Sequence, residues 1–198
     1  MLIIGITGTL GAGKGTIVEY LEKQEKFRHF SVRGYIAEEI EKRGLQVNRD
    51  TLTIVANELR AKNSPSFIVD RLYEKAIETD QNCIIESIRT PGEIISLRNK
   101  GAFFLFAVDA DANSRYERIK ARASVTDHVD FQTFLANEAR EMNTDDPNKQ
   151  NLKKCIEMSD YRFNNDNSVD ELQNKVAQVL KNIQMDLQCK NTNNGIRK

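Results

Sequence analysis

The chain has 198 residues, of which 29 are basic and 29 are acidic, so its formal net charge is zero. This length predicts one domain, because typical domains have about 100–200 residues. Hydrophobic residues make up 39% of the chain, which argues against a disordered or fibrous protein. A neutral chain is a poor candidate for bulk binding to nucleic acid or to an anionic membrane, so we expect neither partner.

The cysteines and the first apolar run predict a cytoplasmic protein. Cys83, Cys155 and Cys189 are far apart and odd in number, which fits neither a disulfide framework nor a zinc-binding pattern. The apolar run at residues 2–6 is too short for the core of a signal peptide or for a membrane span. The sequence does not indicate the oligomeric state.

Short apolar runs alternate with longer amphipathic stretches. We expect strands at residues 1–7, 27–32, 82–87 and 102–108, and a weak fifth strand at 161–163. Near-continuous apolar runs are typical of parallel strands that are buried on both faces. Helices are expected at residues 15–25, 34–44, 50–62, 66–79, 91–100, 112–123, 130–142, 148–158 and 168–185. The alternation predicts an α/β fold, with a parallel sheet of about five strands flanked by helices.

The last expected helix has a clear start and is followed by a polar tail. Ser168 and Glu171 form a capping box ahead of apolar residues at helical spacing. Residues 187–198 are polar and rich in asparagine, and we expect them to be disordered. The domain is therefore predicted to span residues 1–186.

A glycine-rich loop follows the first strand and opens the first helix. Glycines let such a loop turn tightly, so that its N–H groups and the positive end of the helix face one anion. A lysine at its end can reach the terminal phosphates of a di- or triphosphate. The strand–loop–helix context favours a nucleotide site over a turn that binds nothing. The residues that we expect to bind the nucleotide are Gly8, Gly11, Ala12, Gly13, Lys14, Gly15 and Thr16.

The loop ends in GKGT, with Gly15 between Lys14 and the hydroxyl of Thr16. Thr16 is therefore expected to meet Mg²⁺ either directly or through a water molecule. The ending resembles that of nucleoside monophosphate kinases of the adenylate kinase type. The opening, IIGITGTLGAGK, is also similar to that of dephospho-coenzyme A kinase. Both are P-loop kinases that phosphorylate a small acceptor containing a nucleotide.

The resemblance implies a P-loop kinase fold with two functional additions. The first is a helical insert that binds the acceptor, at about residues 34–80, and the second is a short lid at about 120–140. Monophosphate kinases usually carry an arginine for the acceptor phosphate after the second strand, where this chain has Ala37. Arg33 is four residues earlier and is a candidate to replace it. Arg49 and Arg60, within the insert, either face the cleft or lie on solvated helix surfaces.

The third strand ends in an acid and is followed by an arginine. Glu86 resembles the acid at the Walker B position, usually an aspartate in this class, which implies a place near Mg²⁺. Arg89 is expected to bind the acceptor phosphate, because an arginine fork matches phosphate oxygens. Asp109, at the end of the fourth strand, either contributes to Mg²⁺ binding or a water network or has a structural role.

Three arginines share one face of the helix that leads to the expected lid. Arg115, Arg118 and Arg122 are three and four residues apart. The pattern resembles the lid arginines that close over the donor in these kinases, and Arg118 and Arg122 are the favoured pair. Arg140 is either a further lid arginine or a structural residue.

Together these features predict transfer of the γ-phosphoryl group of ATP, with Mg²⁺, to a small nucleotide acceptor. A nucleoside or deoxynucleoside monophosphate is the favoured acceptor, and its base and sugar do not follow from the sequence. One alternative is dephospho-coenzyme A kinase, although no hydroxyl-activating acid follows the second strand. Another is an ATP-binding regulatory or adaptor domain without transfer activity. Lys14, Arg118 and Arg122 are the expected catalytic residues, Arg33 and Arg89 the acceptor ligands, and Thr16 and Glu86 the metal ligands.

Overall fold

The computed structural model describes residues 1–122 and 129–195, and only the main chain of 190–195. Five parallel strands form one sheet in the order β2-β3-β1-β4-β5. This confirms the predicted α/β fold with a parallel sheet of five strands. The strands are β1 (Leu2–Gly8), β2 (Arg28–Ser31), β3 (Cys83–Glu86), β4 (Ala102–Asp109) and β5 (Tyr161–Asn164).

The strand register brings the ends of four strands together. Glu86 pairs with Ile6 of β1 on one side and with Ser31 of β2 on the other. On the far side of β1, Gly8 pairs with Val108 of β4. The glycine-rich loop therefore leaves the carboxyl edge of the sheet next to Glu86, where open α/β sheets bind their ligands.

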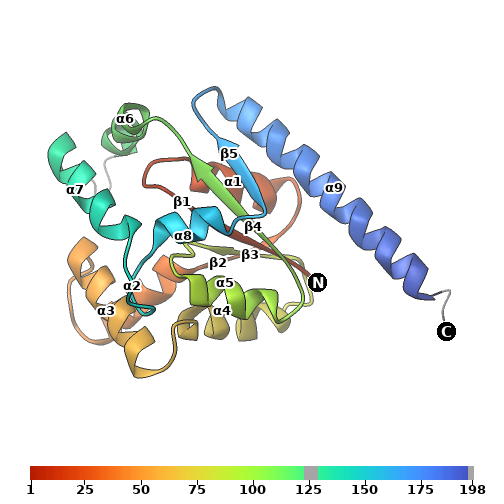
Figure 1. The fold of residues 1–198 in the computed structure, drawn as a ribbon, viewed down its shortest axis with the longest axis horizontal. Helices are drawn as coiled ribbons and strands as arrows, with labels where there is room; N and C mark the ends of the chain where they lie inside the picture. Colours follow the sequence, from red (N-terminus) through yellow and green to blue (C-terminus); the bar gives the residue numbers. More distant parts are fainter. Residues whose placement is uncertain (123–128, 196–198) are drawn as a thin grey trace.

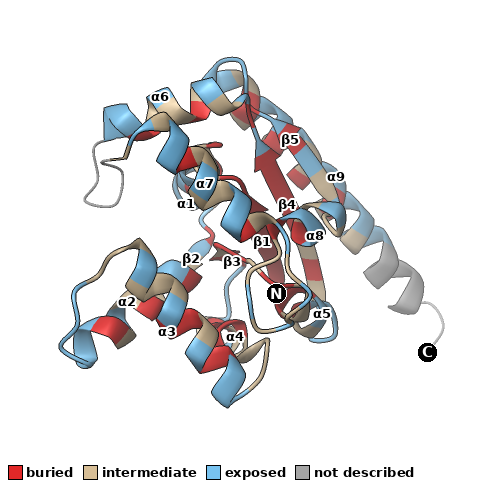
Figure 2. Cartoon of the chain, turned by 60° about the vertical axis from the view of Figure 1, so that its left-hand side comes forward, coloured by how far each residue is buried: buried red, intermediate tan, exposed pale blue. Residues whose placement is uncertain are grey.

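Helices cover both faces of the sheet (Figure 1). One face packs against α1 (Lys14–Lys23) and α9 (Val169–Gly195), through Ile4, Ile6 and Phe106. The other face packs through Ile85 and Leu105 against α4 (Phe67–Ile77), α5 (Pro91–Arg98) and α8 (Leu152–Glu157). Figure 2 shows the strands as the most deeply buried part of the fold. Burial on both faces is why β1 and β4 are apolar almost throughout.

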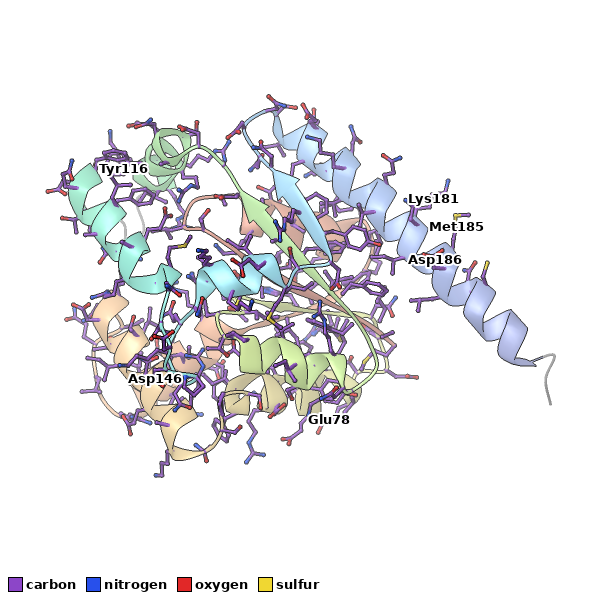
Figure 3. All side chains as sticks on the ribbon, viewed as in Figure 1. Glu78, Tyr116, Asp146, Lys181, Met185 and Asp186 are labelled. Atoms are coloured by element: carbon purple, nitrogen blue, oxygen red, sulfur yellow. The ribbon has the colours of Figure 1, made fainter. Side chains whose placement is uncertain are left out.

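Two further helix pairs lie at the carboxyl edge (Figure 2). The first is α2 (Val32–Lys42) with α3 (Arg49–Lys62), which, with α4, occupies most of the range expected for the acceptor insert. The second is α6 (Ala112–Arg122) with α7 (Phe131–Met142). Tyr116 of α6 packs its ring against Phe131 and Phe134 of α7 (Figure 3). The centre of the expected lid, residues 123–128, lies outside the described residues.

The helix α9 is longer than the sequence suggested. It runs to Gly195, so the prediction of a disordered tail at 187–198 is wrong for residues 187–195. Between Ser168 and Gly195 the sequence has neither proline nor glycine, so nothing stops the helix at its expected end. Its second half, with Lys181, Met185 and Asp186, projects beyond the sheet (Figure 3). No helix in the described ranges is both long and apolar enough to cross a membrane.

A buried ion pair joins the insert to the sheet domain. The guanidinium of Arg60 in α3 donates to Glu93 Oε1 of α5 from Nε at 3.2 Å and from Nη2 at 2.8 Å. The side chains of Arg60 and Glu93 are 1% and 0% exposed. The second carboxylate oxygen, Oε2, accepts from the backbone N–H groups of Arg89 and Thr90. Arg60 is therefore not the solvated helix arginine that the sequence left possible.

We predict that Glu93→Ala lowers the free energy of unfolding by about 3–5 kcal/mol, because it leaves the Arg60 charge buried without its partner. Urea denaturation measures this change. The control is Glu74→Ala, which removes an exposed pair with Arg71 and should leave the midpoint unchanged. Equal effects of the two substitutions would contradict the role of the Arg60–Glu93 pair.

Candidate functional site

The loop between β1 and α1 needs glycine at defined positions. Gly8 has φ 136°, and a Cβ there would lie 2.1 Å from the carbonyl oxygen of Val108. Gly13 caps α1 with φ 107°, and a Cβ there would lie 2.3 Å from Nδ2 of Asn165. Both positions combine a left-handed backbone with no room for a side chain. The glycines thus allow the loop to wrap closely between β4 and the segment that follows β5.

Lys14 lies over this loop. Its ammonium donates to the carbonyl oxygens of Gly8 at 2.9 Å and Thr9 at 2.7 Å. Burial, and after it the positive charge of Arg89, lowers the pKa of Lys14 to about 8, against the opposing effect of Glu86 and Glu141. An anion bound in the loop would restore the preference for the charged ammonium. Binding of an anion in the loop would therefore be accompanied by proton uptake at Lys14.

Three contacts fix the loop from behind. Thr9, which is buried, donates from Oγ1 to Asp109 Oδ1 at 2.5 Å. Arg115 donates to the carbonyl oxygens of Ala110 and Leu10 and is paired with Glu138 of α7. Asn165 donates to the carbonyl oxygen of Ala12 at 2.8 Å. Asp109 and Arg115 therefore hold the loop in place, and neither lines the cavity in front of it.

A cavity of about 700 Å³ extends from the loop to the insert. Its size is that of a pocket for a nucleotide-sized ligand. At one end it is lined by Lys14, Thr16 and the segment after β5, and at the other by α2 and α3. The predicted site residues on its wall are Gly11, Gly13, Lys14, Gly15, Thr16, Arg33, Glu86, Arg89, Arg118 and Arg122. Ala12 has no exposed surface, and Gly8 meets Lys14 through its carbonyl oxygen.

Glu86 lies on the cavity wall between β2 and the loop. Its carboxylate accepts from Ser31 Oγ at 3.2 Å and from Ser87 Oγ at 2.6 Å. Ser87 has φ 71°, an uncommon value for a residue other than glycine. The described residues contain no group of three or more His, Cys, Asp or Glu suited to a metal. Mg²⁺ bound through phosphates needs only one or two protein oxygens, however, and Thr16 and Glu86 are oxygen donors of that kind.

Two arginines and one carboxylate meet opposite Lys14. Arg89 donates from Nη1 to Glu141 Oε2 at 2.5 Å, and Arg49 donates from Nη1 to Glu141 Oε1 at 3.1 Å. The exposed fractions of the three side chains are 17%, 19% and 10% for Arg89, Arg49 and Glu141. Burial alone would raise the pKa of Glu141, but Arg89 and Arg49 hold it below the usual range. The carboxylate is therefore ionised at neutral pH.

Of the other arginines considered from the sequence, three line the cavity and one does not. Arg118, which donates to the carbonyl oxygen of Asn165 at 2.7 Å, and Arg122 line the cavity from α6. Arg33 lines it from α2, one turn before Ala37, at an exposed position. Arg140 lies outside the cavity lining and pairs with Asp50 of α3.

Sequence patterns did not single out Glu141 or Asn165, and they marked Glu93 only as the acid of the helix start Thr90–Glu93, which the structure confirms as a capping box. Glu141 is a single acid in a helix, and only its partners in space distinguish it from a surface residue; the same is true of the pairing of Glu93 with Arg60. Asn165 carried a usable signal, because it directly follows the fifth strand, whose carboxyl end joins the same edge of the sheet. The prediction for that edge used Glu86 and Asp109 and omitted the residues after β5.

Comparison with known proteins gives the family. Residues 4–144 match the model of an AAA domain family, AAA_18. The chain belongs to this family of AAA domains. A UPF0200 protein of Methanococcus maripaludis strain C7 is 27% identical over 186 residues, which cover 92% of this chain and 98% of the relative. A UPF0200 protein of Methanocaldococcus jannaschii is 26% identical and covers 92% of this chain and 91% of the relative.

Solved structures agree on the fold of this AAA domain. A shikimate kinase from Aquifex aeolicus matches with a TM-score of 0.53 at 13% identity, over 93% of this chain and 99% of that one. A gluconokinase from Sinorhizobium meliloti matches with a TM-score of 0.55 at 13% identity, over 93% and 97%. These similarities establish a P-loop kinase fold. They leave the narrower resemblance to monophosphate kinases as a prediction.

We predict that ATP binding at about pH 8.5 takes up about three-quarters of a proton. The phosphates draw back the proton that Lys14 has largely lost there, whereas the γ-phosphate is already ionised, with a second pKa of about 6. Calorimetry in two buffers that differ in ionisation enthalpy measures the uptake. Lys14→Met should abolish it, and wild-type binding without proton uptake would contradict the placement of Lys14.

Proposed function

We propose that the protein transfers the γ-phosphoryl group of ATP, with Mg²⁺, to a small nucleotide acceptor in the cytoplasm. The favoured acceptor is a nucleoside or deoxynucleoside monophosphate. One observation carries the proposal: a single cavity joins the glycine-rich loop and Lys14 to a pair of arginines, Arg49 and Arg89, that face them. A donor phosphate and an anionic acceptor can thus meet without leaving the protein.

The position of each residue in the cavity suggests its role in the reaction. The N–H groups of the loop and Lys14 hold the donor phosphates and neutralise the charge that shifts during transfer. Arg89, with Arg33, aligns the acceptor phosphate, and Arg118 and Arg122 approach the donor from α6. Thr16 and Glu86 would hold Mg²⁺, whose charge offsets that of the phosphates. Because the acceptor attacks directly, no covalent intermediate with the protein is needed.

The test is a coupled assay of ADP release. Nucleoside and deoxynucleoside monophosphates are offered in parallel with dephospho-coenzyme A, shikimate and gluconate, and we expect release with a monophosphate. Release only with dephospho-coenzyme A would favour its kinase, although residues 27–35, at β2 and directly after it, contain no acid to activate a hydroxyl. ATP binding without ADP release for any acceptor would favour the adaptor alternative. Two departures from the kinase pattern are compatible with that alternative: Ala37 stands where the acceptor arginine is usual, and Glu86 where aspartate is usual.

We predict that Lys14→Met lowers turnover by about 10²–10³-fold with little change in thermal stability. The lysine contributes a charge that matters most as the phosphoryl group moves. Steady-state kinetics and a melting curve measure the two effects. A variant that folds normally and retains turnover close to wild type would contradict the assigned role.

We predict that Arg89→Ala raises the KM for the acceptor at least about tenfold and changes the KM for ATP much less, because a charged hydrogen bond contributes about 1.5–3 kcal/mol. Arg89→Lys retains the charge without the fork, so its KM for the acceptor should lie between those of wild type and Arg89→Ala. Equal losses for both substrates would show that Arg89 does not belong to the acceptor end.

A further inference from the structure

The carboxylate of Glu141 occupies a place that suits an anion from outside the chain. Each of its oxygens accepts a hydrogen bond from a different arginine, Arg49 on the insert and Arg89 after β3. Arginine forks bind carboxylate and phosphate in the same way. The three side chains line the cavity and remain partly exposed, so a ligand can reach them.

The surroundings of the arginine pair favour negative charge. Arg49 is the first residue of α3, whose N-terminus is capped by Asn48 and carries the positive end of the helix dipole. Lys14 is close enough to Arg89 and Glu141 for their charges to affect its pKa. Four basic side chains therefore share this part of the cavity with two carboxylates, Glu86 and Glu141, which still leaves an excess of positive charge when the loop is empty. The four are Lys14, Arg49, Arg89 and Arg122.

Glu141 itself is held there against a local preference. It lies in the last turn of α7, Phe131–Met142, where the helix dipole disfavours an anion. Its position therefore depends on the two arginines and not on its own helix. A side-chain rotation would release both arginines while α7 stays anchored through Arg115–Glu138 and Arg140–Asp50.

We infer that Arg49 and Arg89 form an oxyanion subsite that Glu141 fills in the free protein and that the phosphate of the acceptor takes by displacing it. The identity of the displacing ligand rests on the proposed function, whereas the subsite itself does not. Arg49 thereby becomes an acceptor ligand. The exchange also restricts the cleft to acceptors with an anionic group, because a neutral molecule cannot compete with the carboxylate.

Sulfate binding tests the subsite directly. Calorimetry is performed with the loop saturated by Mg²⁺ and ADP. Because the nucleotide then blocks the loop, the arginine pair is the site at which sulfate binding is measured. Glu141→Gln should bind sulfate at least about tenfold more tightly than wild type, because it removes the competing charge and keeps the shape of the side chain. Adding Arg89→Ala to this variant should abolish the gain. Glu141→Ala should show the same gain if the glutamine variant folds poorly.

Arg140→Gln is the matched control. It removes the neighbouring ion pair between the same two helices without touching the cavity, and its sulfate affinity should equal that of wild type. Unchanged or weaker binding by Glu141→Gln would overturn the inference and assign Glu141 to positioning the arginines. A gain that persists without Arg89 would also overturn it.

Acceptor kinetics separate this inference from the proposed function. If a monophosphate is the acceptor, Glu141→Gln should lower its KM by a factor similar to that for sulfate. If no acceptor releases ADP but Glu141→Gln still binds sulfate more tightly, the subsite stands and the proposed function fails. If a monophosphate supports ADP release but Glu141→Gln gains no sulfate affinity, the proposed function stands and the subsite is overturned.

Discussion

The need to hold several positive charges within one partly closed cavity shapes the whole carboxyl edge of the sheet. Lys14 is met by the carbonyl oxygens of Gly8 and Thr9, and Arg60 by the buried carboxylate of Glu93. Arg49 and Arg89 share Glu141. A buried charge without a partner is strongly destabilising, so each cation that the site uses requires an acceptor nearby. The zero net charge of the chain is thus an average that conceals a concentrated positive site.

Arg89 connects this electrostatic arrangement to the fold. Its N–H donates to Glu93, which also holds Arg60 of the insert, and its carbonyl oxygen accepts from Asn151 at the start of α8. Its side chain reaches Glu141 of α7. One short segment after β3 therefore contacts the insert, α7 and α8, so a ligand that binds Arg89 acts on three elements at once. If Arg89 binds the acceptor as proposed, these contacts would couple acceptor binding to the arrangement of the cleft.

The sequence was most informative where a local pattern has one structural solution. Apolar runs and the loop from Gly8 to Gly13 predicted the parallel sheet, the first helix and the position of Lys14. The register of β1 with β3 then placed Glu86 beside the loop, as the resemblance implied. The three arginines of α6 could be predicted to share a face, but not that Arg115 would be buried behind the loop while Arg118 and Arg122 line the cavity. That difference depends on Glu138 and Asn165, which lie 23 and 47 residues away from Arg115 and Arg118 respectively.

The central claim is that donor and acceptor bind in one cavity with their phosphates adjacent and their nucleosides at opposite ends, and a ligand that spans both ends tests it directly. Two nucleosides joined by a pentaphosphate chain supply such a ligand, with adenosine at the donor end and each common base in turn at the other. Titration calorimetry should show at least one of these compounds binding about 10²-fold or more tightly than ATP, since the second end binds without a second loss of freedom. Binding no tighter than that of ATP, for every base, would contradict a shared cleft for donor and acceptor.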